Sequence, residues 1–144
     1  MSRLSKCCVV LMLAAVSGCQ SEDSQLAVRT NWYIVDVPVP KGFDRNNRES
    51  TYSSSPSGRR ILDVYEGGAE PIKVRNFYLS NMPASQWKFE NESLAGGVYT
   101  LTFTKANETC AITIGKKADK GLFAPTEARV LVEGASAGSK KQAS

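Results

Sequence analysis

Alternating apolar and polar residues in the second half of the chain constrain the fold more than any other feature. In "VYTLTFT" (residues 98–104), the tyrosine, leucine and phenylalanine fall on one side of an extended chain, and the threonines fall on the other. The run "CAITI" (110–114) repeats the pattern, and "WKFE" (87–90) and "ARVLVE" (128–133) have the composition of two more strands. Such one-sided alternation is typical of an antiparallel sheet with one buried and one solvated face.

A hairpin is predicted earlier in the chain. Residues 50–55 and 59–65 flank a Pro-Ser-Gly sequence that favours a tight turn. The segment "WYIVDVPVPKGF" (32–43) is expected to begin extended, but each of its two prolines lacks a backbone N–H. We therefore expect this segment to be an edge strand or a polyproline-like entry to the domain.

One helix is predicted, over residues 69–83. Pro71 suits the first turn, where its missing N–H costs nothing, and Pro83 ends the helix. Its apolar side chains recur at spacings of three and four and form one stripe. Laid on the apolar face of the sheet, this stripe predicts an α+β fold: two layers, with one main helix packed on a mostly antiparallel sheet of about five strands.

The helix stripe is expected to form an apolar cluster with the start of the next strand. Such a cluster could line a ligand pocket or be ordinary core, and core is the preferred interpretation because aromatic side chains between a helix and a sheet usually pack there. The predicted cluster consists of Val74, Phe77, Tyr78, Met82, Trp87 and Phe89.

The first 18 residues have the features of a secretory signal peptide. A basic start precedes a short apolar run (7–16), about half of the roughly 20 residues that a membrane-spanning helix needs. The run ends in Val-Ser-Gly-Cys, which resembles the bacterial lipobox. The resemblance implies cleavage between Gly18 and Cys19 and attachment of palmitate-type acyl chains to Cys19.

Lipidation would place the mature chain in the cell envelope as a membrane-anchored protein, because two or more acyl chains give stable anchoring. Gln20 replaces the aspartate that retains enterobacterial lipoproteins in the inner membrane, so the outer membrane, facing the periplasm, is favoured. We expect a tether over residues 19–29, a single α+β domain over 30–134 and a disordered tail over 135–144.

The composition argues against several functions. The chain contains no histidine, which removes the commonest general base and the commonest metal ligand. The full chain has a net charge of +4, and loss of the two bases in the signal peptide would leave the mature chain near +2, too little to indicate nucleic-acid binding. Cys110 is the one cysteine left after the signal peptide and the lipid site, so no intramolecular disulfide is expected, and it is interpreted as a buried structural residue. We expect no enzyme activity, no catalytic residue, no cofactor and no metal site.

The charged residues are interpreted as solvated surface. A cation or acid–base site is the alternative for three acids, but they are scattered over strand, turn and helix start: Asp63, Glu66 and Glu70. Four arginines are expected to gather near the hairpin as exposed charges that contribute little to stability: Arg45, Arg48, Arg59 and Arg60.

Four segments together resemble a known family. They are "PVPKGF", "RRILDVYEGG", "VRNFYLSNMPASQW" and "LTFTKANETCAITI", with the motifs P-x-P-x-G-F, Y-x-G, F-Y-x-x-x-M-P-x-x-x-W and L-x-F-x-K-x-x-E-x-C. This pattern, over about residues 36–115, is similar to a family of small bacterial lipoproteins and secreted proteins of the planctomycete type, with a domain of unknown function. The resemblance implies a compartment and a common fold, and it implies no catalytic residue.

The preferred functional hypothesis is a lipid-anchored bacterial cell-envelope protein that acts as a non-catalytic binding or assembly module for another envelope protein. The alternative is a small-ligand-binding protein, or an enzyme or accessory subunit that acts on the cell wall, in the periplasm. A filled interior and a flat apolar patch would favour the first hypothesis, and a deep pocket with clustered carboxylates would favour the second.

Overall fold

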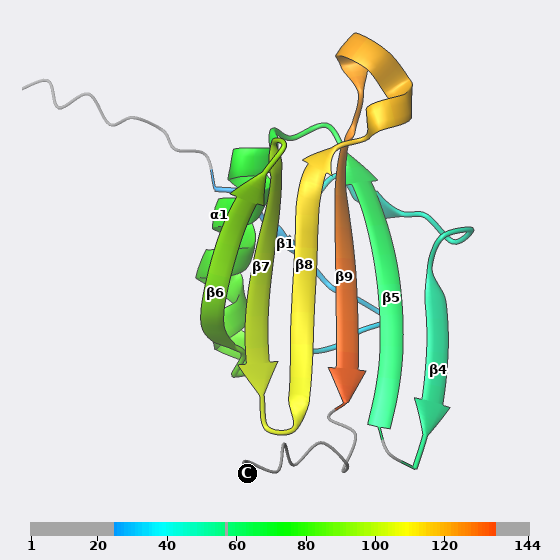
Figure 1. Ribbon diagram of the computed structural model, residues 1–144, viewed down its shortest axis with the longest axis vertical. Helices are drawn as coiled ribbons and strands as arrows, with labels where there is room; N and C mark the ends of the chain where they lie inside the picture. Colours follow the sequence, from blue (N-terminus) through cyan, green and yellow to red (C-terminus); the bar gives the residue numbers. More distant parts are fainter. Residues whose placement is uncertain (1–24, 57, 135–144) are drawn as a thin grey trace, which may run out of the picture.

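The structure is a computed structural model that describes residues 25–56 and 58–134. An antiparallel sheet of seven strands dominates it, with neighbours in the order β3-β5-β9-β8-β7-β6 and β4 also paired with β5 (Figure 1). The strands of this sheet are β3 (Phe43–Arg45), β4 (Thr51–Ser55), β5 (Gly58–Gly67), β6 (Lys88–Ala95), β7 (Val98–Lys105), β8 (Glu108–Lys116) and β9 (Thr126–Gly134).

Tight turns join β4 to β5, β6 to β7 and β7 to β8. Gly96 and Gly97, between β6 and β7, both have positive φ angles, 58° and 78°, which suit a two-residue turn that matches the strand twist. The hairpin of β4 and β5 confirms the prediction for residues 50–65, and the strands predicted over 98–104 and 110–114 are confirmed as β7 and β8. A short 3-10 helix, η2 (Ala118–Phe123), separates β8 from β9.

The predicted helix is confirmed as α1 (Pro71–Asn81). Pro71 occupies its first turn, where no hydrogen-bond donor is needed. The α-helix ends before Pro83, and the chain continues in a 3-10 turn, η1 (Met82–Ser85). Gln86 then adopts a left-handed conformation, with φ of 67°, and turns the chain into β6.

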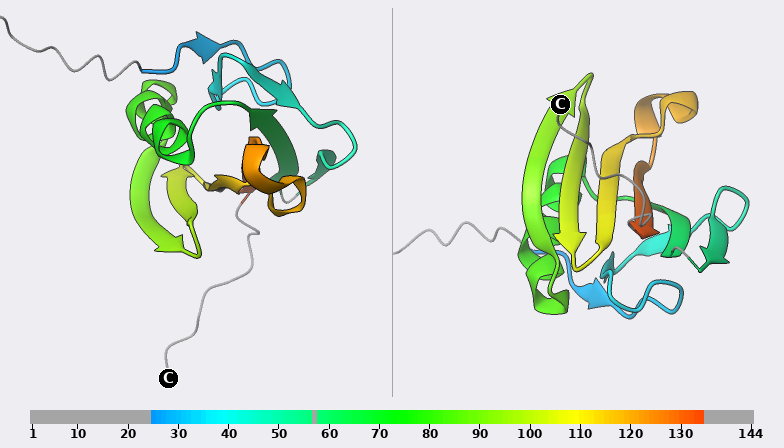
Figure 2. Two further views of the ribbon diagram at one scale, coloured as in Figure 1. Left: turned by 90° about the horizontal axis from the view of Figure 1, so that it is seen from above. Right: turned by 60° about the horizontal axis from the view of Figure 1, so that its bottom comes forward.

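The sheet is strongly curved, and its concave face holds the core (Figure 2). The helix α1 lies against part of this face and contacts β7, β8 and β9. Buried residues alternate with partly exposed ones along β8 and β9, so each strand contributes every second side chain to the core.

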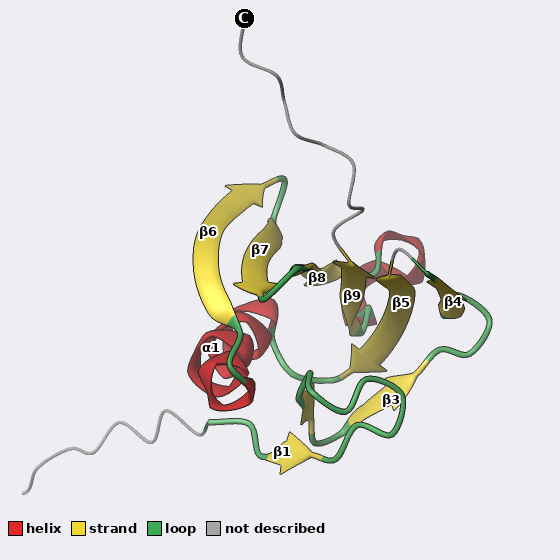
Figure 3. Ribbon diagram, turned by 90° about the horizontal axis from the view of Figure 1, so that it is seen from below, coloured by secondary structure: helices red, strands yellow, loops and turns green. Residues whose placement is uncertain are grey.

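The rest of the concave face is covered by the N-terminal segment, residues 26–41, which we call the strap (Figure 3). Within the strap, β1 (Val28–Arg29) pairs with β2 (Val39–Pro40) as a separate two-stranded sheet. Ile34 and Val37, from the loop between them, are buried in the same cluster as the side chains of the large sheet. The strap is therefore part of the folded domain.

The predicted fold class is wrong. The sheet has seven strands instead of about five, and a single helix does not form the second layer. With 11 residues, α1 is about 16 Å long, too short to cover the concave face of a curved seven-stranded sheet. The strap covers what remains, and its sequence pattern does not predict that it crosses the open part of the concave face.

The described structure includes the last part of the segment that the sequence assigns to a tether (19–29). In that part, Leu26 packs against the core. The predicted signal peptide (1–18), the lipid site Cys19 and the predicted tail (135–144) lie outside the described residues. Among the described residues, no helix is long and apolar enough to cross a membrane.

Candidate ligand-binding site

A carboxylate lies in the interior, on the concave side of β5. Asp63 is fully buried, and Arg45 of β3 holds it through Nη2 and Nε, which lie 2.7 and 2.8 Å from Oδ1. Tyr65 donates its hydroxyl to Oδ2 at 2.9 Å. A buried charge is costly unless it is paired and hydrogen-bonded, so these three groups act as one unit. The predictions that Asp63 is solvated and that Arg45 is a free surface charge are wrong.

The Tyr65 hydroxyl connects this unit to the strap. It lies 3.2 Å from Oδ1 of Asn31, which also accepts hydrogen bonds from the backbone N–H groups of Tyr33 and Ile34. Burial, followed by the negative charge of Asp63, raises the pKa of Tyr65. The hydroxyl therefore keeps its proton, and the side-chain oxygens of Asp63 and Asn31 are its two neighbouring acceptors.

Tyr78 brings a second hydroxyl into the interior, from α1. Its side chain is fully buried and packs edge-on against Phe77, with 5.3 Å between the ring centroids. In the described part of the chain, the Tyr78 hydroxyl has no hydrogen-bond partner. Burial raises the pKa of Tyr78, and the nearby Tyr65, Cys110 and Asp63 add to the shift through their charged forms. The hydroxyl is thus protonated and unpaired, in a region that it shares with these three groups.

Cys110 contributes a thiol to the same interior from β8. It is fully buried and free, and burial raises its pKa. A thiol without thiolate character is a weak nucleophile, so its position suits a packing residue.

The predicted apolar cluster comes together except at one end. Phe89 is 43% exposed, although its ring packs against buried Phe103 with 5.7 Å between centroids. The residue points to the expected side of the sheet, but β6 is an edge strand, so one side of the ring has no cover. The buried members are Val74, Phe77, Tyr78, Met82 and Trp87.

Asp36 fastens the strap to the sheet. Its carboxylate lies 2.9 Å from Nζ of Lys105 and 3.0 Å from Nη2 of Arg59, and its carbonyl accepts the indole N–H of Trp87 at 2.8 Å. Arg59 also binds Glu108, with 2.6 Å between Nε and Oε1. Burial acts to raise the pKa of Asp36, but the hydrogen bonds and charges of Lys105 and Arg59 outweigh it, and the pKa is lowered. Arg59 is therefore a structural cation, contrary to the prediction.

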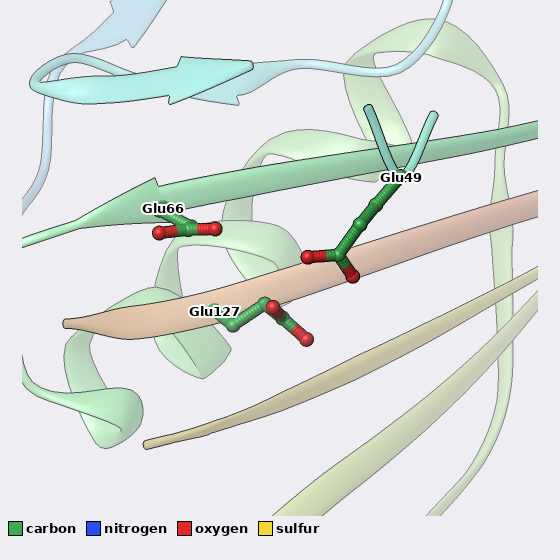
Figure 4. Close-up of side chains that lie close together, drawn as sticks. All are labelled: Glu49, Glu66 and Glu127. Carbon is green, nitrogen blue, oxygen red and sulfur yellow. The ribbon is translucent and has the colours of Figure 1, made fainter. Parts of the chain in front are cut away.

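Three glutamates meet on the convex face of the sheet: Glu49, Glu66 and Glu127 (Figure 4). One carboxylate oxygen from each lies within 4.8 Å of the others, close enough to suggest a cation site. However, Nζ of Lys117 lies 2.7 Å from Glu66 and 3.1 Å from Glu49, and Nη1 of Arg129 lies 2.7 Å from Glu49. These two side chains already supply the positive charge that a metal ion would bring.

The three acids that the sequence groups as an alternative site do not come together in the structure. Asp63 faces the interior, Glu66 belongs to the convex cluster, and Glu70 precedes α1 and lies 3.2 Å from Lys116. One sequence signal could have revealed the buried acid, since Asp63 alternates with Ile61 and Tyr65 on the apolar side of its strand.

Comparison with protein families matches the part of the chain that contains Asp63, Tyr65, Tyr78 and Cys110. A family model described as START domain-like matches residues 47–127. The match includes α1 and nearly all of the sheet except β3 and most of β9, and it leaves out the strap. Searches of curated proteins and of solved structures found no match. A START-like fold is a helix-grip fold, and it too differs from one main helix packed on a sheet of about five strands.

Proposed function

Because the chain belongs to a START domain-like family, whose model matches residues 47–127 of its 144, we propose that it binds a small, largely apolar molecule inside the curved sheet. The molecule lies beside α1 and accepts a hydrogen bond from the hydroxyl of Tyr78. The protein is a binding protein, and no catalytic step is part of the proposal.

The unpaired hydroxyl of Tyr78 carries this proposal. A buried polar group without a partner costs about 1–3 kcal/mol, and such groups in folded proteins call for an explanation. Tyr65, by contrast, donates its proton to Asp63 at 2.9 Å, and Oδ1 of Asn31 lies 3.2 Å from the same hydroxyl. Tyr78 is therefore the hydroxyl of this interior that has a donor to spare for a ligand.

The surroundings of Tyr78 indicate the chemistry of the ligand. The side chains of the same buried cluster are mostly aliphatic and aromatic, among them Met82, Phe103 and Ile112. The interior acid, Asp63, is neutralised by Arg45 and leaves no net charge to attract an ion. An apolar wall with a few convergent polar groups suits an uncharged, mostly apolar molecule with one hydrogen-bond acceptor.

Mass spectrometry under native conditions tests this proposal on protein extracted from its own membranes. We expect the wild type to retain a small molecule and Tyr78→Phe to retain at least about tenfold less, a loss of roughly 1.4 kcal/mol in affinity. Tyr52→Phe is the matched control, because Tyr52 is 68% exposed on β4. A wild type without any retained molecule, or equal retention in Tyr78→Phe, would contradict the proposal.

We also propose that acyl chains on Cys19 hold this domain in the bacterial cell envelope, at the outer membrane and facing the periplasm. The support is the lipobox-like Val-Ser-Gly-Cys at residues 16–19 and the apolar run before it. Cys19→Ala should release the protein from the membrane fraction. If the variant still sediments with membranes after washes with high salt and mild alkali, lipid is not the anchor.

An envelope protein partner is a second candidate function, and the edge strand β6 favours it. Its side chains are exposed along nearly the whole strand, and within the described residues its outer edge is unpaired. An unpaired edge can accept a strand from another protein. Cross-linking from Asn91→Cys, at the middle of β6, should capture one reproducible partner in native envelopes. Cross-links no more frequent than those from Tyr52→Cys would count against it.

A further inference from the structure

The loop between β1 and β2, residues 30–38, exposes three large side chains within four consecutive positions, 32–35. Val35 is 87% exposed, Trp32 is 84% exposed and Tyr33 is 56% exposed. Valine and tryptophan are usually well buried in folded proteins. We call Trp32, Tyr33 and Val35 the loop patch. A contiguous apolar patch of this kind marks an interaction surface.

The loop patch is held in place from behind. Asn31 is buried; its amide nitrogen donates to the carbonyl of Val37 at 3.1 Å, and its oxygen accepts from the N–H groups of Tyr33 and Ile34. Ile34 and Val37 are buried in the core, and the N–H of Val37 bonds to the carbonyl of Ile34 at 3.0 Å. The exposure of the patch is therefore built into the fold and does not arise from a loose loop.

The charges around the loop patch are mostly positive or neutralised. The strap contains two bases, Arg29 and Lys41, and both are exposed. Its one acid, Asp36, is paired with Lys105 and Arg59 on the side of the sheet. Arg29 lies 3.8 Å from exposed Asp44, a pair that water and salt weaken.

From these observations, we infer that the loop patch contacts a membrane: Trp32, Tyr33 and Val35 enter the interface of a lipid bilayer. Tryptophan and tyrosine favour the level of the lipid head groups, because an apolar ring and a polar tip suit that boundary. The exposed bases of the strap, Arg29 and Lys41, attract anionic lipids. The inference does not depend on the proposed ligand of Tyr78, but the choice of a bilayer as the partner rests on the proposed lipid anchor at Cys19.

The position of the patch in the chain indicates a bilayer as the partner. Cys19, the predicted lipid site, is only six residues before Gln25, where the described structure begins. Six residues span at most about 20 Å. The strap, which includes β1, lies across the core from the strands β8 and β9 of the large sheet (Figures 2 and 3). A short attachment to this side keeps the patch close to the membrane surface.

Tryptophan fluorescence tests the inference, because the chain has two tryptophans and the other one, Trp87, is buried. The protein is the chain from residue 19 with Cys19→Ser, so that no acyl chain contributes. With vesicles of phosphatidylethanolamine and phosphatidylglycerol, we expect Trp32 emission to shift to shorter wavelength and quenching by iodide to fall severalfold. Lipids brominated near the head group should quench the same emission.

A double variant and a matched control complete the test. Trp32→Ala with Val35→Ser should lower the vesicle-bound fraction by at least about tenfold, and leave the melting temperature unchanged. Leu94→Ser removes another exposed apolar side chain, on β6, and should bind vesicles as the parent does. Any of three results would overturn the inference. Iodide quenching of Trp32 could be unchanged by vesicles, or the double variant and Leu94→Ser could lose vesicle binding equally. The third result is a dimer that forms without lipid and that the double variant abolishes.

Discussion

Asp63 and Tyr78 are buried polar residues in opposite situations. Asp63 accepts hydrogen bonds from Arg45 and Tyr65, whereas the hydroxyl of Tyr78 has no partner among the described residues. The free energy of unfolding of a domain is about 5–15 kcal/mol, so each of these side chains affects a noticeable share of it. The paired residue stabilises the fold, and the unpaired one suggests a use in binding.

Arg45→Gln should lower the free energy of unfolding by about 3 kcal/mol, because it leaves the buried carboxylate of Asp63 without its cation. Urea unfolding measures the change. Arg48→Gln is the control, since Arg48 is exposed, and its effect should stay within about 0.5 kcal/mol. Similar effects of the two substitutions would show that Arg45 does not stabilise the buried acid.

At the level of elements, side chains from distant parts of the sequence hold the strands and the strap together. Lys117, which follows β8, binds Glu49 before β4 and Glu66 at the end of β5. Trp87, which precedes β6, donates its indole N–H to the carbonyl of Asp36 in the strap. Replacing Lys117 or Trp87 therefore tests the attachment of one element to another.

Lys117→Gln should change how stability depends on pH. Hydrogen bonds from Arg129 and Lys117 lower the pKa of Glu49, and those from Lys117 and Asn46 lower the pKa of Glu66. A lowered pKa contributes stability above the unfolded value of 4.5, and this stability is lost as pH falls through the folded value. The variant should therefore lose less stability than the wild type between about pH 6 and pH 3.

Urea unfolding across this pH range measures the difference in slope. Lys116→Gln is the matched control, because the neighbouring Lys116 pairs with Glu70 and, among the described residues, forms no ion pair with the three glutamates. It should keep the wild-type pH dependence. Equal slopes for Lys117→Gln and the wild type would mean that Lys117 does not set the pKa values of these glutamates.

Trp87→Ala should lower the free energy of unfolding by about 3–5 kcal/mol, because it removes a large side chain that is 1% exposed. Trp32→Ala should change it by less than about 0.5 kcal/mol, because that side chain lies in solvent. Calorimetric or urea unfolding compares the two. A small effect at Trp87 would mean that the strap and η1 do not pack around its indole.

For the whole molecule, features with a local period could be predicted from the sequence. Alternation predicts β7 and β8, turn residues predict the hairpin of β4 and β5, and the spacing of Val74, Phe77 and Tyr78 predicts α1. Each of these signals lies within a few residues of chain, because strands and helices repeat at two and about 3.6 residues.

Features that depend on distant contacts could not be predicted. The ion pair of Asp36 with Lys105 joins residues 69 positions apart, and no local pattern marks it. The curvature of the sheet and the covering strap follow from how all strands pair, so the two-layer prediction omitted both. The unpaired hydroxyl of Tyr78 was likewise hidden, because in sequence the residue is one more member of an apolar stripe.

Interior ligand binding predicts that Tyr78 reduces the stability of the empty protein and increases that of the loaded one. Without ligand, Tyr78→Phe should be as stable as the wild type or more stable by up to about 1–3 kcal/mol, because a buried unpaired hydroxyl is removed. Tyr65→Phe is the control. Tyr65→Phe should be less stable than the wild type both with and without ligand, because Asp63 loses a hydrogen bond.

Urea unfolding of ligand-free wild type and Tyr78→Phe, with and without the organic extract of the natively purified protein, compares these states directly. A ligand that binds the folded state stabilises it by mass action. We predict that the extract stabilises the wild type much more than Tyr78→Phe, and so reverses the order of the two proteins. If Tyr78→Phe is the less stable protein without extract, or gains as much stability from it as the wild type, the hydroxyl of Tyr78 does not bind a ligand.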